Sequence, residues 1–93
     1  MNTIFKYRIP PQDYFNLDLP IGAEILCVQL QGMTPYIWAL VADNEPKERR
    51  FFYLVGTGNE FINASKKRRY IGTFQVHLPG LFVGHLFEIG ISE

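Results

Sequence analysis

The first stretch of the chain alternates with a period of two residues. Over residues 3–9, one set of positions is Ile4, Lys6 and Arg8, and the other is Phe5, Tyr7 and Ile9. A period of two is typical of a half-buried β-strand, because successive side chains point to opposite faces. The second set is wholly apolar or aromatic, so we expect it to face a core. Pro10 and Pro11 then end this strand, since neither can donate a hydrogen bond to a neighbouring strand.

Further strand-like segments follow, each rich in β-branched or aromatic residues and bounded by glycine or proline turns. They cover residues 23–31, 36–43, 50–55, 70–77 and 81–89. Residues 12–19 read as a loop or a short edge element, and residues 59–69 read as an exposed polar loop.

No segment carries a sustained apolar period of 3.6 residues, which an amphipathic helix would need. The pattern therefore predicts an all-β fold: a small antiparallel β-sandwich or partly open barrel of about six strands, with little or no helix. A length of 93 residues leaves room for one hydrophobic core, so we expect a single β domain over residues 1–93.

Composition agrees with a folded domain, since 47% of residues are hydrophobic and the formal net charge is zero. The single cysteine, Cys27, cannot form an internal disulfide, which favours a cytoplasmic location. Its apolar neighbours predict a small core residue rather than a reactive thiol. The sequence has neither a membrane-spanning run nor the pattern of a signal peptide, so we expect no membrane association.

The zero net charge conceals a strong asymmetry. Seven of the nine basic residues lie between positions 47 and 69, a segment with a net charge of +5, and the remainder of the chain carries −5. Basic residues cluster before and after the fourth predicted strand. A folded-back loop would bring these clusters together into a site for phosphate groups, a nucleotide or an acidic protein face. The candidate anion-binding or partner-binding residues are Arg49, Arg50, Lys66, Lys67, Arg68 and Arg69. The alternative is a solvated loop that only promotes solubility.

Catalytic chemistry has little support in the sequence. His77 and His85 have no companion ligands at zinc-site spacing, and a satisfied strand histidine is the favoured interpretation of His85. The turn Val55-Gly56-Thr57-Gly58 lacks the residues that complete a phosphate-binding loop. We therefore expect no enzyme activity, no metal and no cofactor.

The aromatic residues suggest a further feature. Phe51 and Tyr53 share one face of a strand, and Phe52 lies on the other, so this strand is expected to be buried on both sides. A partner subunit could supply one of the two covers, which predicts a homo-oligomer.

Several segments, in this order, resemble a family of small proteins of unknown function from bacteriophages and prophages. They are residues 19–29 (LPIGAEILCVQ), 37–41 (IWALV), 46–48 (PKE), 55–58 (VGTG), 70–75 (YIGTFQ) and 85–88 (HLFE). The resemblance spans nearly the whole chain and implies a phage-encoded accessory protein, without implying a reaction.

These observations favour a non-catalytic binding protein that inhibits a host defence component, as anti-CRISPR proteins do, through the basic segment 47–69. Its partner would be a host protein or a protein–nucleic-acid complex. Two alternatives remain open: an oligomer that sequesters an anionic, nucleotide-like small molecule, and a virion or structural assembly protein.

Overall fold

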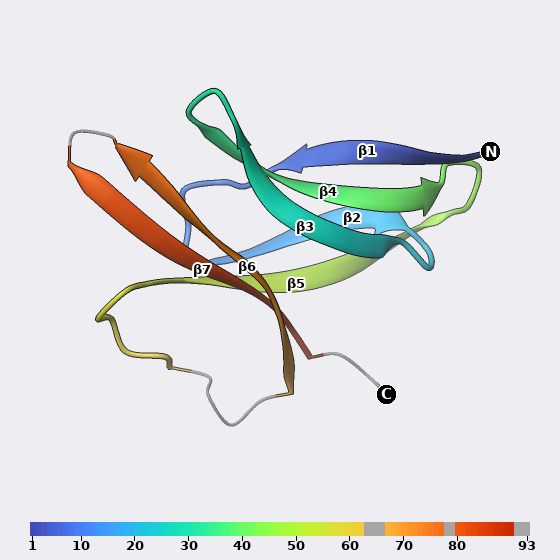
Figure 1. Cartoon of the computed structure of the whole chain (residues 1–93). Helices are drawn as coiled ribbons and strands as arrows, with labels where there is room; N and C mark the ends of the chain where they lie inside the picture. Colours follow the sequence, from blue (N-terminus) through green and yellow to red (C-terminus); the bar gives the residue numbers. More distant parts are fainter. Residues whose placement is uncertain (63–66, 78–79, 91–93) are drawn as a thin grey trace.

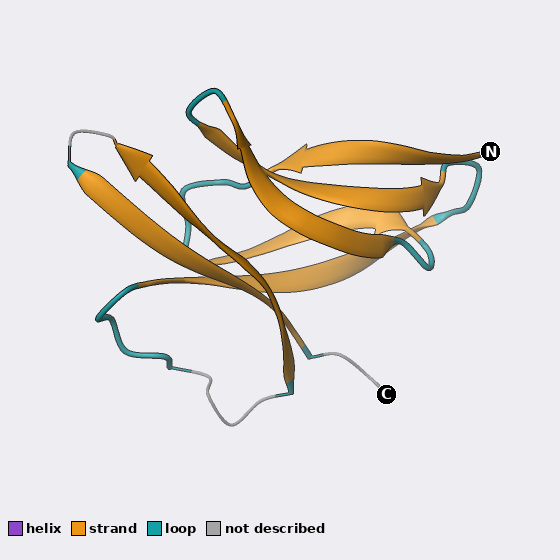
Figure 2. Ribbon diagram, in the orientation of Figure 1, coloured by secondary structure: helices purple, strands orange, loops and turns teal. Residues whose placement is uncertain are grey.

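The computed structural model of the protein describes residues 1–62, 67–77 and 80–90, which form seven β-strands (Figure 1). The strands are β1 (Asn2–Arg8), β2 (Tyr14–Pro20), β3 (Glu24–Gln31), β4 (Thr34–Ala42), β5 (Lys47–Gly56), β6 (Arg68–His77) and β7 (Leu81–Ile89). Within the described ranges the remainder consists of turns and loops, with no helix that could span a membrane (Figure 2).

The strands form two antiparallel sheets that pack face to face. One sheet has three strands in the order β1-β4-β3, and the other has four in the order β2-β5-β7-β6. The two sheets are not closed into a barrel by strand pairing, so of the two predicted architectures the sandwich is the one observed. The all-β prediction is confirmed.

Of the two interpretations of residues 12–19, a loop or a short edge element, the edge element is the one observed, because an ordered edge strand occupies most of this segment. All seven residues of β2 pair with β5, from Tyr14 opposite Tyr53 to Pro20 opposite Lys47. Phe15 and Leu19 point inward and are buried. This segment has a period of two, but the preceding prolines obscure it. They are compatible with β2 because it is an edge strand and they lie before its first residue.

The core forms where the inner faces of both sheets meet. Its most completely buried large side chains are Phe52, Leu19, Ile37, Leu86 and Val41, which come from four different strands. The predicted inner face of the first strand is largely confirmed. Ile9 is buried and Tyr7 packs against the core, but Phe5 remains 43% exposed.

Cys27 is not the core residue that the sequence predicts. A β-bulge between Ile25 and Cys27 inserts one residue into β3, which shifts the phase of the alternation. As a result Ile25 and Val28 both face the core, whereas Cys27 lies opposite Trp38 on the outer side and is only partly buried.

The two sheets approach most closely where the edge strands β3 and β6 meet (Figure 1). A second bulge, between Tyr70 and Gly72, lies in β6 at this point. A Cβ atom on residue 72 would lie 2.7 Å from Cγ1 of Val28, so only glycine permits this spacing. Nη2 of Arg69 also donates a hydrogen bond to the carbonyl oxygen of Ile25, at 3.0 Å. We call this contact the β3–β6 seam.

A buried ion pair lies next to the seam. Nε and Nη2 of Arg50 donate to the two carboxylate oxygens of Glu88, at 2.6 and 2.9 Å. Nη1 of Arg50 donates to the carbonyl oxygen of Ala23 at 2.5 Å, which ties β5 to the start of β3 across the sandwich. Among the described residues, Glu88 is the charged one whose side chain is buried. Its carboxylate can be buried because it pairs with Arg50.

The two consecutive arginines provide a matched test of this pair. Changing Glu88→Gln leaves the Arg50 guanidinium without its buried counter-charge, and we expect the free energy of unfolding to fall by about 3 kcal/mol. Changing Asp18→Asn removes the exposed partner of Arg49 and should cost less than about 1 kcal/mol. Urea denaturation of both variants measures the difference, and equal losses would show that the Arg50–Glu88 pair is not a structural tie.

A second prediction concerns the seam itself. Changing Gly72→Ala should destabilise the protein by about 1–3 kcal/mol, because the new methyl group overlaps Val28. In the double variant Gly72→Ala, Val28→Ala the overlap is relieved, so the combined loss should be smaller than the sum of the single losses. Strict additivity of the three unfolding free energies would rule out this close approach.

Candidate functional site

The alternation of β5 and β6 separates the predicted basic residues into two groups. Arg50 and Arg69 lie on the inner faces of their strands, where they bond to Glu88 and to the carbonyl of Ile25. Arg49 and Arg68 lie on the outer face of the four-stranded sheet, in the same alternation as Phe51 and Tyr70. The six candidates therefore do not form one cluster.

The inner arginines are part of the fold rather than free anion ligands. Hydrogen bonding to the Glu88 carboxylate raises the pKa of Arg50, against a smaller opposing effect of burial, so its positive charge is retained. A surface hollow of about 380 Å³ lies beside this pair, and Arg49, Arg50 and Arg69 all contribute to its lining. Glu48 and Glu88 line the same hollow, so its charge is mixed rather than purely basic.

The remaining candidates lie at or before the start of β6. Lys67 and Arg68 are exposed, whereas Lys66 lies outside the described residues. The sequence predicts that residues 66–69 belong to one exposed loop. In the structure β6 begins at Arg68, and Arg69 donates a hydrogen bond across the seam to the carbonyl oxygen of Ile25. Neutralising all four residues together would therefore disturb the fold as well as any binding surface.

A row of aromatic side chains crosses the outer face of the four-stranded sheet. Tyr14 pairs with Tyr53, Tyr53 with Phe87, and Phe87 with Tyr70, so each strand contributes one ring at the same level. The ring centroids of these neighbours are 4.6 Å apart for Tyr14–Tyr53 and 5.4 Å apart for Tyr70–Phe87. Directly opposed aromatic side chains stabilise a sheet beyond the area that they bury.

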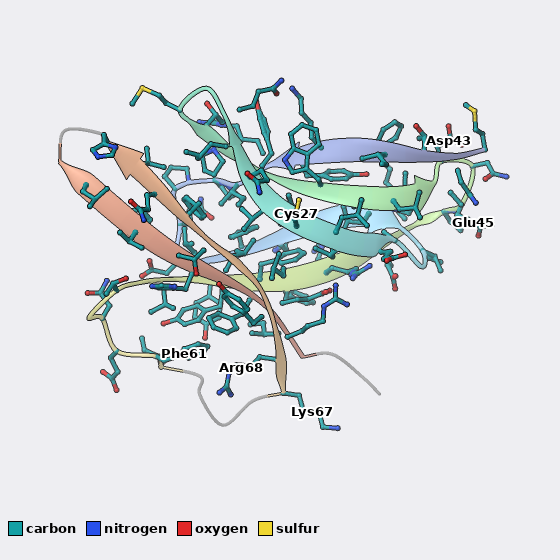
Figure 3. All side chains as sticks on the ribbon, viewed as in Figure 1. Cys27, Asp43, Glu45, Phe61, Lys67 and Arg68 are labelled. Atoms are coloured by element: carbon teal, nitrogen blue, oxygen red, sulfur yellow. The ribbon has the colours of Figure 1, made fainter. Side chains whose placement is uncertain are left out.

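The segment after β5 folds back over the middle of this row. The Phe61 ring lies 5.0 Å from Tyr53 and 4.9 Å from Phe87, between centroids. The Arg68 guanidinium lies 5.0 Å from the Phe61 ring centroid, a cation–π contact that places positive charge on the aromatic surface. Figure 3 shows Phe61 and Arg68 beside each other below the sheet, with Lys67 nearby.

This cover explains the double-sided burial of β5. The sequence predicted burial on both faces of the strand, and Phe52 and Tyr53 are 0% and 3% exposed, but Phe51, on the same face as Tyr53, is 50% exposed. The second cover comes from the chain's own Phe61 and the neighbouring rings, so burial of Tyr53 does not require a partner subunit.

The edges of the aromatic row remain accessible. Tyr14 and Tyr70 are 43% and 56% exposed, and Phe51, one row along on the same face, is 50% exposed. Arg49, Arg68 and these three rings together form what we call the aromatic–basic face. Aromatic residues and arginine are the residue types that most often dominate protein interfaces.

A chain of polar side chains borders this face. Nε2 of His85 lies 2.6 Å from Oγ1 of Thr57, and Nδ1 lies 2.9 Å from Oγ1 of Thr73, which is itself 2.5 Å from the Tyr70 hydroxyl. Both ring nitrogens of His85 therefore have partners, as the sequence interpretation expected. Thr57 lies in the glycine turn, whose identification as a strand-ending turn is also confirmed. No group of three potential metal-binding side chains occurs within the described ranges.

The sequence did not reveal the aromatic–basic face as a unit. Each strand carried its aromatic residue visibly, but the row exists only because β2 pairs with β5 and β5 with β7, which are distant in the chain. The alternation of Arg49 against Arg50 was readable from the strand pattern. The prediction did not use this alternation and therefore placed both arginines in one cluster.

The comparisons with known proteins give one match. Neither the curated proteins nor the solved structures contain a match to this chain. One protein-family model matches residues 1–91, and its description is a domain of unknown function, DUF7352. Because that match covers all seven strands described above, the chain belongs to the DUF7352 family.

Proposed function

We propose that this protein is a non-catalytic binding protein and that the aromatic–basic face is its interaction surface. The observation that supports this proposal most directly is the exposure of Tyr14, Phe51 and Tyr70 around a rigid cross-strand row. Exposed apolar surface of this kind is costly to keep in water and usually marks an interaction site.

The charges on this face favour an acidic partner. Arg68 is held over the Phe61 ring. Arg49 pairs with Asp18 at 3.3 Å, and the side chains of Arg49 and Asp18 are both more than half exposed. An exposed pair of this kind is weak, so an incoming carboxylate or phosphate can compete for the arginine. Arginine also binds such groups in a bidentate manner that lysine cannot match.

The sequence resemblance to phage-encoded proteins suggests where such a partner occurs. In an infected bacterium, a small binder with this basic face would act by covering an acidic surface of a host defence component, or the nucleic acid that such a protein–nucleic-acid complex carries. This role needs no catalytic residues, in keeping with the thin catalytic inventory of the sequence.

The first test compares two side chains of equal exposure. Tyr70 and Leu81 are 56% and 57% exposed, but only Tyr70 belongs to the aromatic–basic face. With partner captured from host lysate and purified, we expect Tyr70→Ala to weaken binding about thirtyfold and Leu81→Ala to leave it unchanged. Calorimetric titration measures both dissociation constants.

Two further measurements make this test decisive. Arg68→Ala should weaken binding and reduce its salt dependence, whereas Arg8→Ala on the other sheet should change neither. Retention of oligothymidylate by the wild-type chain instead of a protein would identify nucleic acid as the ligand. The proposal fails if no partner is retained, or if Tyr70→Ala and Leu81→Ala bind equally well.

We also propose that the protein self-associates through the outer face of its three-stranded sheet. Ile4 lies opposite Leu40 there, and both are exposed, at 55% and 38%. Nε1 of Trp38, on the same face, is buried without a hydrogen-bond partner among the described residues. A second copy would cover the exposed Ile4 and Leu40 side chains.

Light scattering on the purified chain tests self-association. The wild-type protein should have at least twice the mass of one chain, and Leu40→Lys should reduce it to a monomer because a buried charge without a partner is costly. Ile21→Lys, at a 48% exposed turn position outside this face, is the matched control. A monomeric wild-type protein would contradict self-association. It would not bear on the aromatic–basic face, which the partner-binding test above examines.

A further inference from the structure

The outer edge of the three-stranded sheet is formed by β1, and no described strand pairs with it on that side (Figure 1). The amide of Asp43 donates to the carbonyl oxygen of Met1, and the amide of Ile9 donates to the carbonyl oxygen of Pro35. Because the register between β1 and β4 is continuous, these two bonds turn every odd-numbered residue of β1 toward β4. The backbone N–H and C=O groups of the even-numbered residues therefore point out from the sheet edge. They belong to Asn2, Ile4, Lys6 and Arg8.

The other edge strands carry features that hinder the addition of a further strand. β3 and β6 each contain a bulge, and they meet at the seam. In β2, the bond from the Leu54 amide to the Asp13 carbonyl turns the even-numbered residues outward. These include Asp18, which is charged, and Pro20, which has no N–H to donate. β1 has no proline, glycine or bulge over its seven residues, so it is the most regular edge of the sandwich.

Lysine often protects an edge strand from pairing, but the charge of Lys6 is directed away from this edge. Its ammonium group lies 4.6 Å from the centroid of the Tyr36 ring on β4, a cation–π contact. The same group donates a hydrogen bond to Oε1 of Gln31 on β3. The side chain thus crosses the outer face of its own sheet, and the middle of the β1 edge is left without a protecting charge.

Exposed apolar side chains lie on both faces of β1 next to this edge. Ile4, on the outer face, is 55% exposed. Phe5 is 43% exposed, although Tyr7 and Ile9, in the same alternation, contact the core. A strand added beside β1 would place one side chain next to Ile4 and the following one next to Phe5, on the opposite face. An extended peptide is the ligand that covers both faces while it pairs with alternate N–H and C=O groups.

The charge at the end of β1 indicates the chemistry of this peptide. Arg8 is exposed and forms no ion pair with another described residue. β1 contains Lys6 and Arg8 but no acidic residue, so a second copy of the strand would add two more positive charges. A segment with a carboxylate opposite Arg8 would instead supply a counter-charge.

We propose that the edge of β1 binds an extended acidic segment of a partner protein as an additional antiparallel strand. The acidic residue comes first in this segment and lies opposite Arg8, and apolar residues follow beside Phe5 and Ile4. Backbone hydrogen bonds supply the affinity, and the alternating side chains supply the specificity. The site belongs to the three-stranded sheet and is separate from the aromatic–basic face on the other sheet.

A heptapeptide of sequence Glu-Thr-Thr-Val-Val-Thr-Thr, blocked at both ends, tests the proposal on the full chain. At ten times its dissociation constant, it should slow amide hydrogen exchange of Ile4, Lys6 and Arg8 by about tenfold. The amides of Phe5 and Tyr7 face β4, so their exchange should not change. Unchanged exchange at the even-numbered residues overturns the proposal. Protection of these amides before peptide is added, increasing with protein concentration, would assign the edge to a second copy and also overturn it.

Methylated peptides provide matched controls that leave the protein unaltered. N-methylation of the third peptide residue, opposite Lys6, removes a donor that faces β1 and should weaken binding by about tenfold or more. N-methylation of the fourth residue, opposite Phe5, modifies a group that faces away and should change the dissociation constant by less than about twofold. Equal losses would show that the peptide does not pair as a strand.

A mutant cycle tests the acidic residue. Arg8→Gln, and glutamine in place of the peptide's glutamate, should each weaken binding about threefold to fivefold, and the two changes together should cost no more than either alone. Arg49→Gln makes the same charge change on the other sheet and should have no effect. Additive losses overturn the pairing of this carboxylate with Arg8. Tyr70→Ala should leave peptide binding unchanged, so failure of this site and failure of the aromatic–basic face are distinguishable.

Discussion

The contact between the edge strands β3 and β6 sets the shape of the whole molecule. The two strands belong to different sheets and do not pair with each other, and each carries a bulge near the point of approach. Gly72 instead lets the backbone of β6 come against Val28, and Arg69 bonds to the carbonyl of Ile25. The sheets are thereby held together on one side. Beside this contact, the Arg50–Glu88 pair and the bond from Arg50 to the Ala23 carbonyl join the sheets a second time.

This constraint also determines what each basic residue can do. A charge near the contact is used to join the sheets, as in Arg50 and Arg69, whereas a charge one residue away in sequence faces the solvent. The concentrated positive charge is thus divided between residues that join the sheets and residues that face the solvent. A net charge of zero and a basic segment of +5 are both compatible with such a surface, since part of that charge is neutralised internally.

Much of the fold was predictable from the sequence because it depends on local alternation. The range of β7 was predicted correctly, and the ends of β1, β3, β4, β5 and β6 lie at most three residues from the predicted ones. The status of Cys27 was not predictable, since a bulge changes which residues face inward and leaves no clear signal in a single sequence. The aromatic row required knowledge of strand order.

The distance along the chain that the β3–β6 contact spans bears on how the protein folds. Arg69 and Ile25 are separated by 44 residues, so β3 is synthesised long before the strand that covers its edge. Until β6 emerges and joins β7, the three-stranded sheet has an uncovered edge that could pair with another chain. Contacts of such long range also slow folding, because the intervening chain must be ordered first. Closure of the sandwich is thus a late event, and the molecule is most open to aggregation just before it.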